Sequence, residues 1–104
     1  MTSRFSVASN NILSVQGNLD VYSVAEAIKQ GSKLLKSNDS FEVIDLQQVN
    51  NMDSAGLAFV IELLKTSKYQ KKNLRFKNIP NRMLAVAKVY GLSKIIPAEA
   101  FQSA

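Results

Sequence analysis

The chain contains no cysteine, no histidine and no tryptophan. Without Cys or His there is no disulfide, no thiolate nucleophile, no imidazole base and no zinc site of the usual kind, so most hydrolytic chemistry is excluded. Two prolines and four glycines are spread over 104 residues, and no linker or low-complexity tract appears. No apolar run approaches the roughly 20 residues that a membrane-spanning helix needs. The sequence therefore predicts a single domain, 1–104, with one core.

The N-terminal segment Met1–Phe5 has no apolar signal core, so we expect a cytoplasmic protein without direct membrane insertion. Its net charge is +5, and acidic residues are absent from Leu63 to Ala98. This 63–98 segment predicts a positive field at one end of the domain. The segment carries nine cations: Lys65, Lys68, Lys71, Lys72, Arg75, Lys77, Arg82, Lys88 and Lys94.

A solvated basic surface is the simplest interpretation of this charge. An acidic protein partner or nearby anionic lipid would also fit it. Nucleic acid fits less well, because only Tyr69 and Phe76 lie among the cations and neither belongs to a stacking motif.

The apolar pattern predicts an α/β domain in the order β-β-α-β-α-β-α, with three helices covering a small mixed sheet of about four strands. The strands are expected at Arg4–Ala8, Ile12–Gln16, Phe41–Leu46 and Asn73–Lys77, with Ser9–Asn11 as a hairpin turn and Gly17 ending the second strand. The helices are expected from Asp20 or Ser23 to Lys36, from Ser54 to Tyr69, and from Pro80 to Gly91.

The turn Met52–Leu57 joins a strand-like run to a helix-like run, which places Ser54 at a helix N-terminus. Unpaired N–H groups and the positive end of the helix dipole meet there. The Ser54 hydroxyl can therefore cap the helix, or it can accept a phosphate that the same donors would receive. Gly56 is expected to allow close packing or relaxed geometry at the helix start.

The second and third helices are apolar beyond the stripe that a one-sided helix needs. In the second helix the expected core-facing stripe is Leu57, Val60, Ile61 and Leu64. In the third helix the expected stripe is Met83, Val86, Ala87 and Tyr90. Leu84 and Val89 of the third helix fall outside its stripe. Either neighbours in the fold or a partner covers the excess. We predict a partner-binding surface, with third-helix residues adjoining, made of Ser54, Ala55, Ala58, Phe59, Glu62 and Leu63.

Three carboxylates follow predicted strands or open predicted helices: Asp20, Asp45 and Asp53. Asp20 has an ordinary role as a helix cap, and Asp45 has one as an acceptor for backbone N–H groups at a strand end. The alternative is an acidic rim beside Ser54. Neither arrangement indicates catalysis, and the sequence predicts no metal site and no cofactor.

Three segments in this order and spacing resemble the STAS domain family: Gly17-Asn18-Leu19-Asp20, Ile44-Asp45-Leu46 and Met52-Asp53-Ser54-Ala55-Gly56-Leu57. The resemblance covers about Phe5 to Ile96. It implies the STAS fold and a non-enzymatic role. The family includes anti-sigma-factor antagonists, whose phosphorylatable serine follows the Asp of this turn, as Ser54 does.

A second branch of the family is the MlaB-type STAS subunit of the Mla phospholipid ABC transporter, which maintains outer-membrane lipid asymmetry. Its last helix looks like Leu-Ala-Lys-x-Tyr-x-Leu, and Val86-Ala87-Lys88-Val89-Tyr90-Gly91-Leu92 is similar, with Val86 in place of the Leu. This resemblance implies an MlaF-type ATPase partner in a complex with a permease, peripheral to the inner membrane. The alternative branch implies an anti-sigma factor and a serine kinase acting on Ser54. The basic charge and short tail favour the transporter branch.

Overall fold

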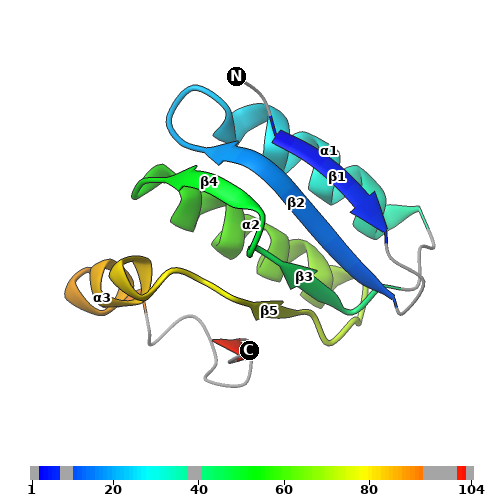
Figure 1. Cartoon of the computed structure of the whole chain (residues 1–104). Helices are drawn as coiled ribbons and strands as arrows, with labels where there is room; N and C mark the ends of the chain where they lie inside the picture. The colour runs from blue at the N-terminus through cyan, green and yellow to red at the C-terminus, as the bar shows by residue number, and fades with distance from the viewer. Residues whose placement is uncertain (1–2, 8–10, 38–40, 93–100, 103–104) are drawn as a thin grey trace.

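The computed structural model describes residues 3–7, 11–37, 41–92 and 101–102. Within these residues, six strand segments pair into one mixed sheet, accompanied by three helices (Figure 1). The predicted α/β class is confirmed. In chain order the elements are β1 Ser3–Val7, β2 Ile12–Leu19, α1 Val24–Lys36, β3 Val43–Asp45, β4 Val49–Met52, α2 Ala55–Tyr69, β5 Arg75–Lys77, α3 Asn81–Val89 and β6 Phe101–Gln102.

The centre of the sheet is β2, which pairs antiparallel with β1 on one edge. On its other edge β2 pairs in parallel first with β3 and then with β4, so these two segments lie one after the other along the same strand. Parallel pairing continues from β3 to β5 and from β5 to β6. Helices α1 and α2 cover one face of the sheet, and α3 lies beyond the end of β5 (Figure 1). The carboxyl ends of β2 and β4 therefore meet at the start of α2.

Helix α2 is buried on two sides. Its Phe59 ring packs 6.1 Å from the Phe5 ring and 6.5 Å from the Phe76 ring, against the sheet. Leu63 packs against α1, where a Cβ on Gly31 would lie only 2.8 Å from the Leu63 Cδ1 atom. Gly31 thus allows the two helices to approach closely.

This packing overturns the prediction that Phe59 and Leu63 point away from the core. Both side chains are 0% exposed. The predicted stripe residues Leu57 and Val60 are also buried, while Ile61 and Leu64 are partly buried at its margin. The second helix carries a broad apolar arc because it contacts both the sheet and α1, so the excess does not itself indicate a partner.

Two strands were not predicted, β4 and β6, and β2 is longer than predicted. Gly17 does not end β2, which continues to Leu19 through a register shift between Gly17 and Asn18. Gly17 has φ of 97°, a left-handed conformation that glycine adopts without strain. Of the predicted strand Phe41–Leu46 only Val43–Asp45 pairs, although Phe41 and Leu46 are buried. The hairpin residues 8–10 lie outside the described part of the chain.

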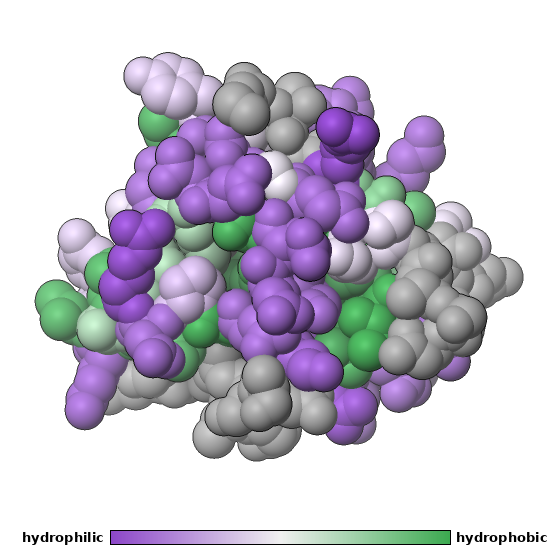
Figure 2. All heavy atoms as spheres, viewed as in Figure 1, coloured by the Kyte–Doolittle hydropathy of each residue, from purple (hydrophilic) through white to green (hydrophobic). Residues whose placement is uncertain are grey.

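The face of the sheet turned away from α1 and α2 is mainly polar (Figure 2). There the Gln16 amide donates hydrogen bonds to the hydroxyls of Ser6, at 3.0 Å, and Ser14, at 3.2 Å. The alternation predicted for β5 is confirmed, since Phe76 is buried and Arg75 is exposed. In this view a band of hydrophilic residues runs across the middle of the molecule.

Helix α3 begins after Pro80 and is followed by Gly91, with φ of 72°, as predicted for a helix end. Met83 and Ala87 are buried and Val86 is partly buried, as predicted. Tyr90 was assigned to the buried stripe, and this is wrong because its side chain is 69% exposed. The short helix ends before Tyr90 can turn toward the core.

Candidate functional site

The turn at the start of α2 is capped by Asp53 rather than by Ser54. The Asp53 carboxylate accepts the N–H of Ala55 at 2.8 Å, and its backbone carbonyl accepts the N–H of Gly56 at 2.8 Å. The Ser54 side chain makes no capping hydrogen bond. Asp53 therefore performs the role that the sequence assigned to Ser54. Ser54 is the N-cap residue and is exposed.

Asp53 also joins this turn to the loop between β2 and α1. Its second carboxylate oxygen accepts the N–H of Val21 at 3.3 Å, and its own N–H donates to the carbonyl of Leu19 at 3.3 Å. One side chain thus bridges the first turn of α2 and a loop 32 residues earlier. The two segments form one connected surface at the carboxyl ends of β2 and β4.

Within that loop, Asp20 organises the entry into α1. Its Oδ1 atom accepts the N–H groups of Tyr22 at 3.0 Å and Ser23 at 3.1 Å. The buried Ser23 hydroxyl donates to the carbonyl of Asn18 at 2.8 Å. Asp20 was predicted as a possible helix cap; the N-cap of α1 is Ser23, and the Asp20 carboxylate instead accepts N–H groups of the turn before the helix, which holds the loop backbone in a defined conformation.

Gly56 is required by close packing. A Cβ at this position would lie 2.6 Å from Met52 Cγ and 3.0 Å from the backbone oxygen of Leu19. Both distances are below ordinary contact, so the start of α2 can pack against β2 and β4 only without a side chain here. This confirms the packing role expected of Gly56.

The exposed side of α2 carries the rest of the predicted surface. Ser54, Ala58 and Glu62 are exposed and spaced four residues apart, so they form one stripe along the helix; Ala55 is partly exposed beside them. Glu62 also approaches Lys65, with 3.5 Å between Oε1 and Nζ. We call Ser54, Ala55, Ala58 and Glu62 the α2 stripe. Phe59 and Leu63, predicted as members, lie in the core instead.

The predicted acidic rim does not form. Asp53 contacts the backbone on both sides of Asp20, but Asp45 lies apart from them. Asp45 is in register with Ser14 of β2, whereas Met52, next to Asp53, is in register with Leu19. Ser14 and Leu19 are five residues apart, a separation of roughly 16 Å along β2. Its carboxylate accepts the N–H of Gln47 and the side-chain amide of Asn78, each at 2.9 Å. That is the ordinary strand-end role.

The basic segment is divided between two ends of the domain, which corrects the prediction of one positive end. Lys72 Nζ donates to the Leu35 carbonyl at 2.8 Å, near the C-terminal ends of α1 and α2. Arg82 donates instead to the Met52 carbonyl at 3.0 Å, beside the N-terminal turn of α2. The intervening helix has 15 residues and is about 22 Å long. Lys94 lies outside the described residues.

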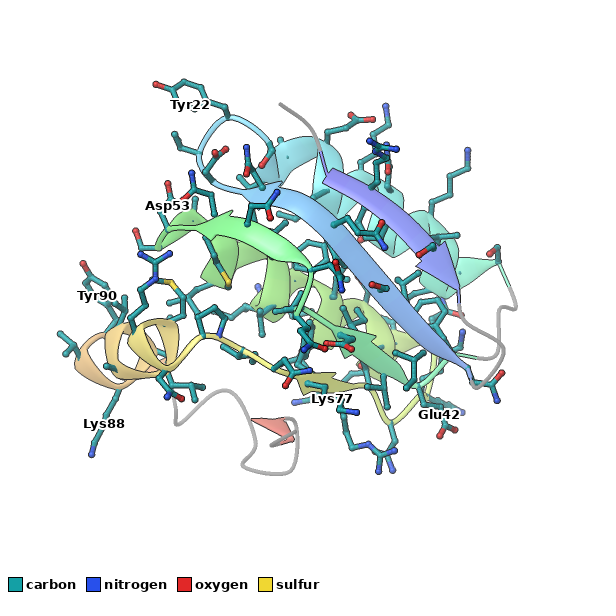
Figure 3. All side chains as sticks on the ribbon, in the orientation of Figure 1. Tyr22, Glu42, Asp53, Lys77, Lys88 and Tyr90 are labelled. Carbon is teal, nitrogen blue, oxygen red and sulfur yellow. The ribbon has the colours of Figure 1, made fainter. Side chains whose placement is uncertain are left out.

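Large exposed apolar side chains gather near the capped turn. Val21 is 65% exposed and Tyr22 is 91% exposed on the β2–α1 loop, and Val89 and Tyr90 are exposed at the end of α3. In Figure 3, Tyr22, Asp53 and Tyr90 follow one another along one edge of the molecule. Tyr69 is the exception, at the other end of α2. Val21 and Tyr22 were not among the predicted site residues.

Among the described residues, no cluster of three or more side chains could hold a metal ion. In the same part of the chain, none of the helices is both long enough and apolar enough to cross a bilayer.

Three solved structures share the fold. The anti-sigma factor antagonist SpoIIAA, unphosphorylated, aligns with a TM-score of 0.62 at 13% identity over 89% of this chain and 96% of its own. The phosphorylated form of SpoIIAA, a Bacillus cell fate determinant, aligns with a TM-score of 0.68 at 16% identity, over 98% of this chain and 90% of its own. A sulfate transporter family protein from Wolinella succinogenes aligns with a TM-score of 0.67 at 14% identity, over 92% of this chain and 79% of its own.

The model of the family described as "Mlab, STAS domain" matches residues 4–97. The chain therefore belongs to the MlaB-type STAS family, and it is related in fold to the anti-sigma-factor antagonists.

Proposed function

We propose that this protein is a non-enzymatic accessory subunit that binds the cytoplasmic ATPase of an Mla-type phospholipid ABC transporter and stabilises or regulates it. The observation that carries the proposal is the match to the MlaB-type family over residues 4–97. The complex would include a permease and would act in outer-membrane lipid asymmetry. The protein itself would lie in the cytoplasm, peripheral to the inner membrane through that complex.

The α2 stripe is the surface on which we place the ATPase. Small side chains at Ser54, Ala55 and Ala58 leave the helix backbone close to the surface, which favours tight packing against another protein. Glu62 extends the stripe with a charge that a basic partner would match. The rigid cap at Asp53 reduces the entropy that binding would cost.

Co-expression of the full chain with the MlaF-type ATPase of the same organism tests this proposal. The tagged protein should retain the ATPase through purification, and Ser54→Arg should release it because the larger side chain projects into the interface. Gln70→Arg is the matched control, since it adds the same group at the exposed opposite end of α2. Failure of the wild-type protein to retain the ATPase would remove the proposal. Retention by a folded Ser54→Arg variant would show that the surface is misplaced.

The second candidate function is an anti-sigma-factor antagonist switched by phosphorylation of Ser54. Its specific support is the exposed Ser54 hydroxyl, which has no capping bond, on a fold shared with SpoIIAA. Asp53 already holds the N–H of Ala55, so an added phosphate dianion would meet the Asp53 carboxylate as well as the positive end of the helix. Phosphorylation would then weaken a contact at this surface.

Intact mass measured after incubation with an anti-sigma-factor-type serine kinase and ATP separates the two functions. One added phosphate on the wild type, absent from Ser54→Ala, supports the switch. An unmodified wild-type protein argues against it.

A further inference from the structure

Tyr22 is the most exposed of the large apolar side chains in the described part of the chain, at 91%. Single exposed tyrosines are common, and exposure alone indicates nothing. The setting of Tyr22 is more informative, because its neighbour Val21 is 65% exposed and both lie in a loop whose backbone is held by side chains.

The loop is fixed independently of any partner. Asp20 holds the N–H of Tyr22, and the Ser23 hydroxyl holds the N–H of Asp20 at 3.1 Å. Asp53 holds the N–H of Val21. A backbone fixed in this way leaves only the side-chain rotation of the ring to be lost when it enters a pocket, and buried aromatic anchors are common among binding hot spots.

The same Asp53 carboxylate connects the loop to the α2 stripe, with one oxygen on Val21 N–H and the other on Ala55 N–H. The loop and the stripe are therefore parts of one continuous surface. We propose that Val21 and Tyr22 form a second arm of the ATPase-binding surface, with Tyr22 inserting its ring into an apolar pocket of the ATPase. Asp53 acts as a positioning residue that fixes the spacing between the two arms.

This inference rests on the proposed function and adds an anchoring side chain to it. Tyr69 provides a matched control, because it is another exposed tyrosine, at 88%, at the opposite end of α2. Neither ring packs into the core, so Tyr22→Ser and Tyr69→Ser should both leave the melting temperature unchanged.

Affinity for the MlaF-type ATPase is measured with the full chain as wild type, Tyr22→Ser and Tyr69→Ser. Tyr22→Ser should weaken binding about 10-fold or more, as loss of a hot-spot aromatic does, and Tyr69→Ser should bind as the wild type does. Equal affinities of the two variants would overturn the second arm while leaving the proposed function standing. Absence of wild-type binding would remove both.

A second measurement reports contact directly. The photoreactive residue p-benzoylphenylalanine, placed at position 22 or at position 69, is illuminated in the presence of the ATPase. A cross-link from position 22 and none from position 69 is expected. A bound ATPase that fails to cross-link from position 22 would refute the proposed arm.

Discussion

Replacement of Asp53 by alanine should destabilise the domain, although the side chain is exposed. The change removes the acceptor for Ala55 N–H, a capping bond worth about 1 kcal/mol. It also removes the longer 3.3 Å bond to Val21 N–H, worth about 0.5 kcal/mol at an exposed site. Loss of a negative charge at the helix N-terminus adds about 0.3–1 kcal/mol. We expect the free energy of unfolding to fall by roughly 2 kcal/mol in total.

Two further variants separate the contributions at this turn. Asp53→Asn keeps one side-chain oxygen as the acceptor for Ala55 N–H but loses the bond to Val21 N–H and the charge, so it should cost about 0.8–1.5 kcal/mol. Ser54→Ala should change the free energy of unfolding by less than about 0.5 kcal/mol, because the hydroxyl makes no capping bond. The loss of unfolding free energy should therefore be largest for Asp53→Ala, intermediate for Asp53→Asn and smallest for Ser54→Ala.

Urea unfolding followed by far-UV circular dichroism measures these differences, since the chain contains no tryptophan for fluorescence. Amide hydrogen exchange provides the local check: in Asp53→Ala the amides of both Val21 and Ala55 should exchange faster. The reasoning is refuted if Ser54→Ala costs as much as Asp53→Ala, or if Asp53→Ala unfolds at the wild-type urea concentration.

Three other substitutions test the packing and the surface. Leu63→Ala should lower the free energy of unfolding by about 2–5 kcal/mol in urea, because it leaves a cavity beside Gly31; a near-neutral result would place Leu63 outside the core. Gly56→Ala should cost about 1–3 kcal/mol in the same assay, since its Cβ would meet Met52 and the Leu19 carbonyl, and an unchanged midpoint would contradict the close packing. Ala58→Arg should leave stability within about 0.5 kcal/mol of wild type but weaken ATPase binding about 10-fold or more by calorimetry, and unchanged affinity would remove Ala58 from the interface.

Local sequence patterns predicted α2 and β5, because both are marked by nearby residues along the chain. The helix from Ser54 to Tyr69 follows from a turn of small residues and a long apolar run, and it begins at Ala55 in the structure. Arg75–Lys77 follows from strict alternation. The strand β4 was missed because Val49–Met52 has two exposed asparagines at its centre and no apolar pattern. This strand forms because it pairs with β2, which is distant in sequence, so the local sequence around Val49–Met52 does not predict it.

The sequence predicted the position of the turn that opens α2, but not the hydrogen bonds and packing around it. The turn at Asp53 and Ser54 was recognised, whereas the division of roles between the two residues depends on which oxygen reaches Ala55 N–H. Helical periodicity could not reveal that α2 packs on α1 as well as on the sheet, so Phe59 and Leu63 were assigned to the surface. The role proposed for the β2–α1 loop depends on the hydrogen bond from Val21 N–H to Asp53, a contact across 32 positions that no local pattern predicts.

The central claim is that the α2 stripe and its adjoining loop bind an ABC-transporter ATPase. Hydrogen exchange of the full chain, measured by mass spectrometry with and without the MlaF-type ATPase, tests it most directly. Peptides that contain Tyr22 and Ser54 to Glu62 should exchange more slowly in the presence of the ATPase, while peptides from the opposite end, around Tyr69 and Lys72, should not change. Protection confined to that opposite end, or no protection anywhere, would contradict the account.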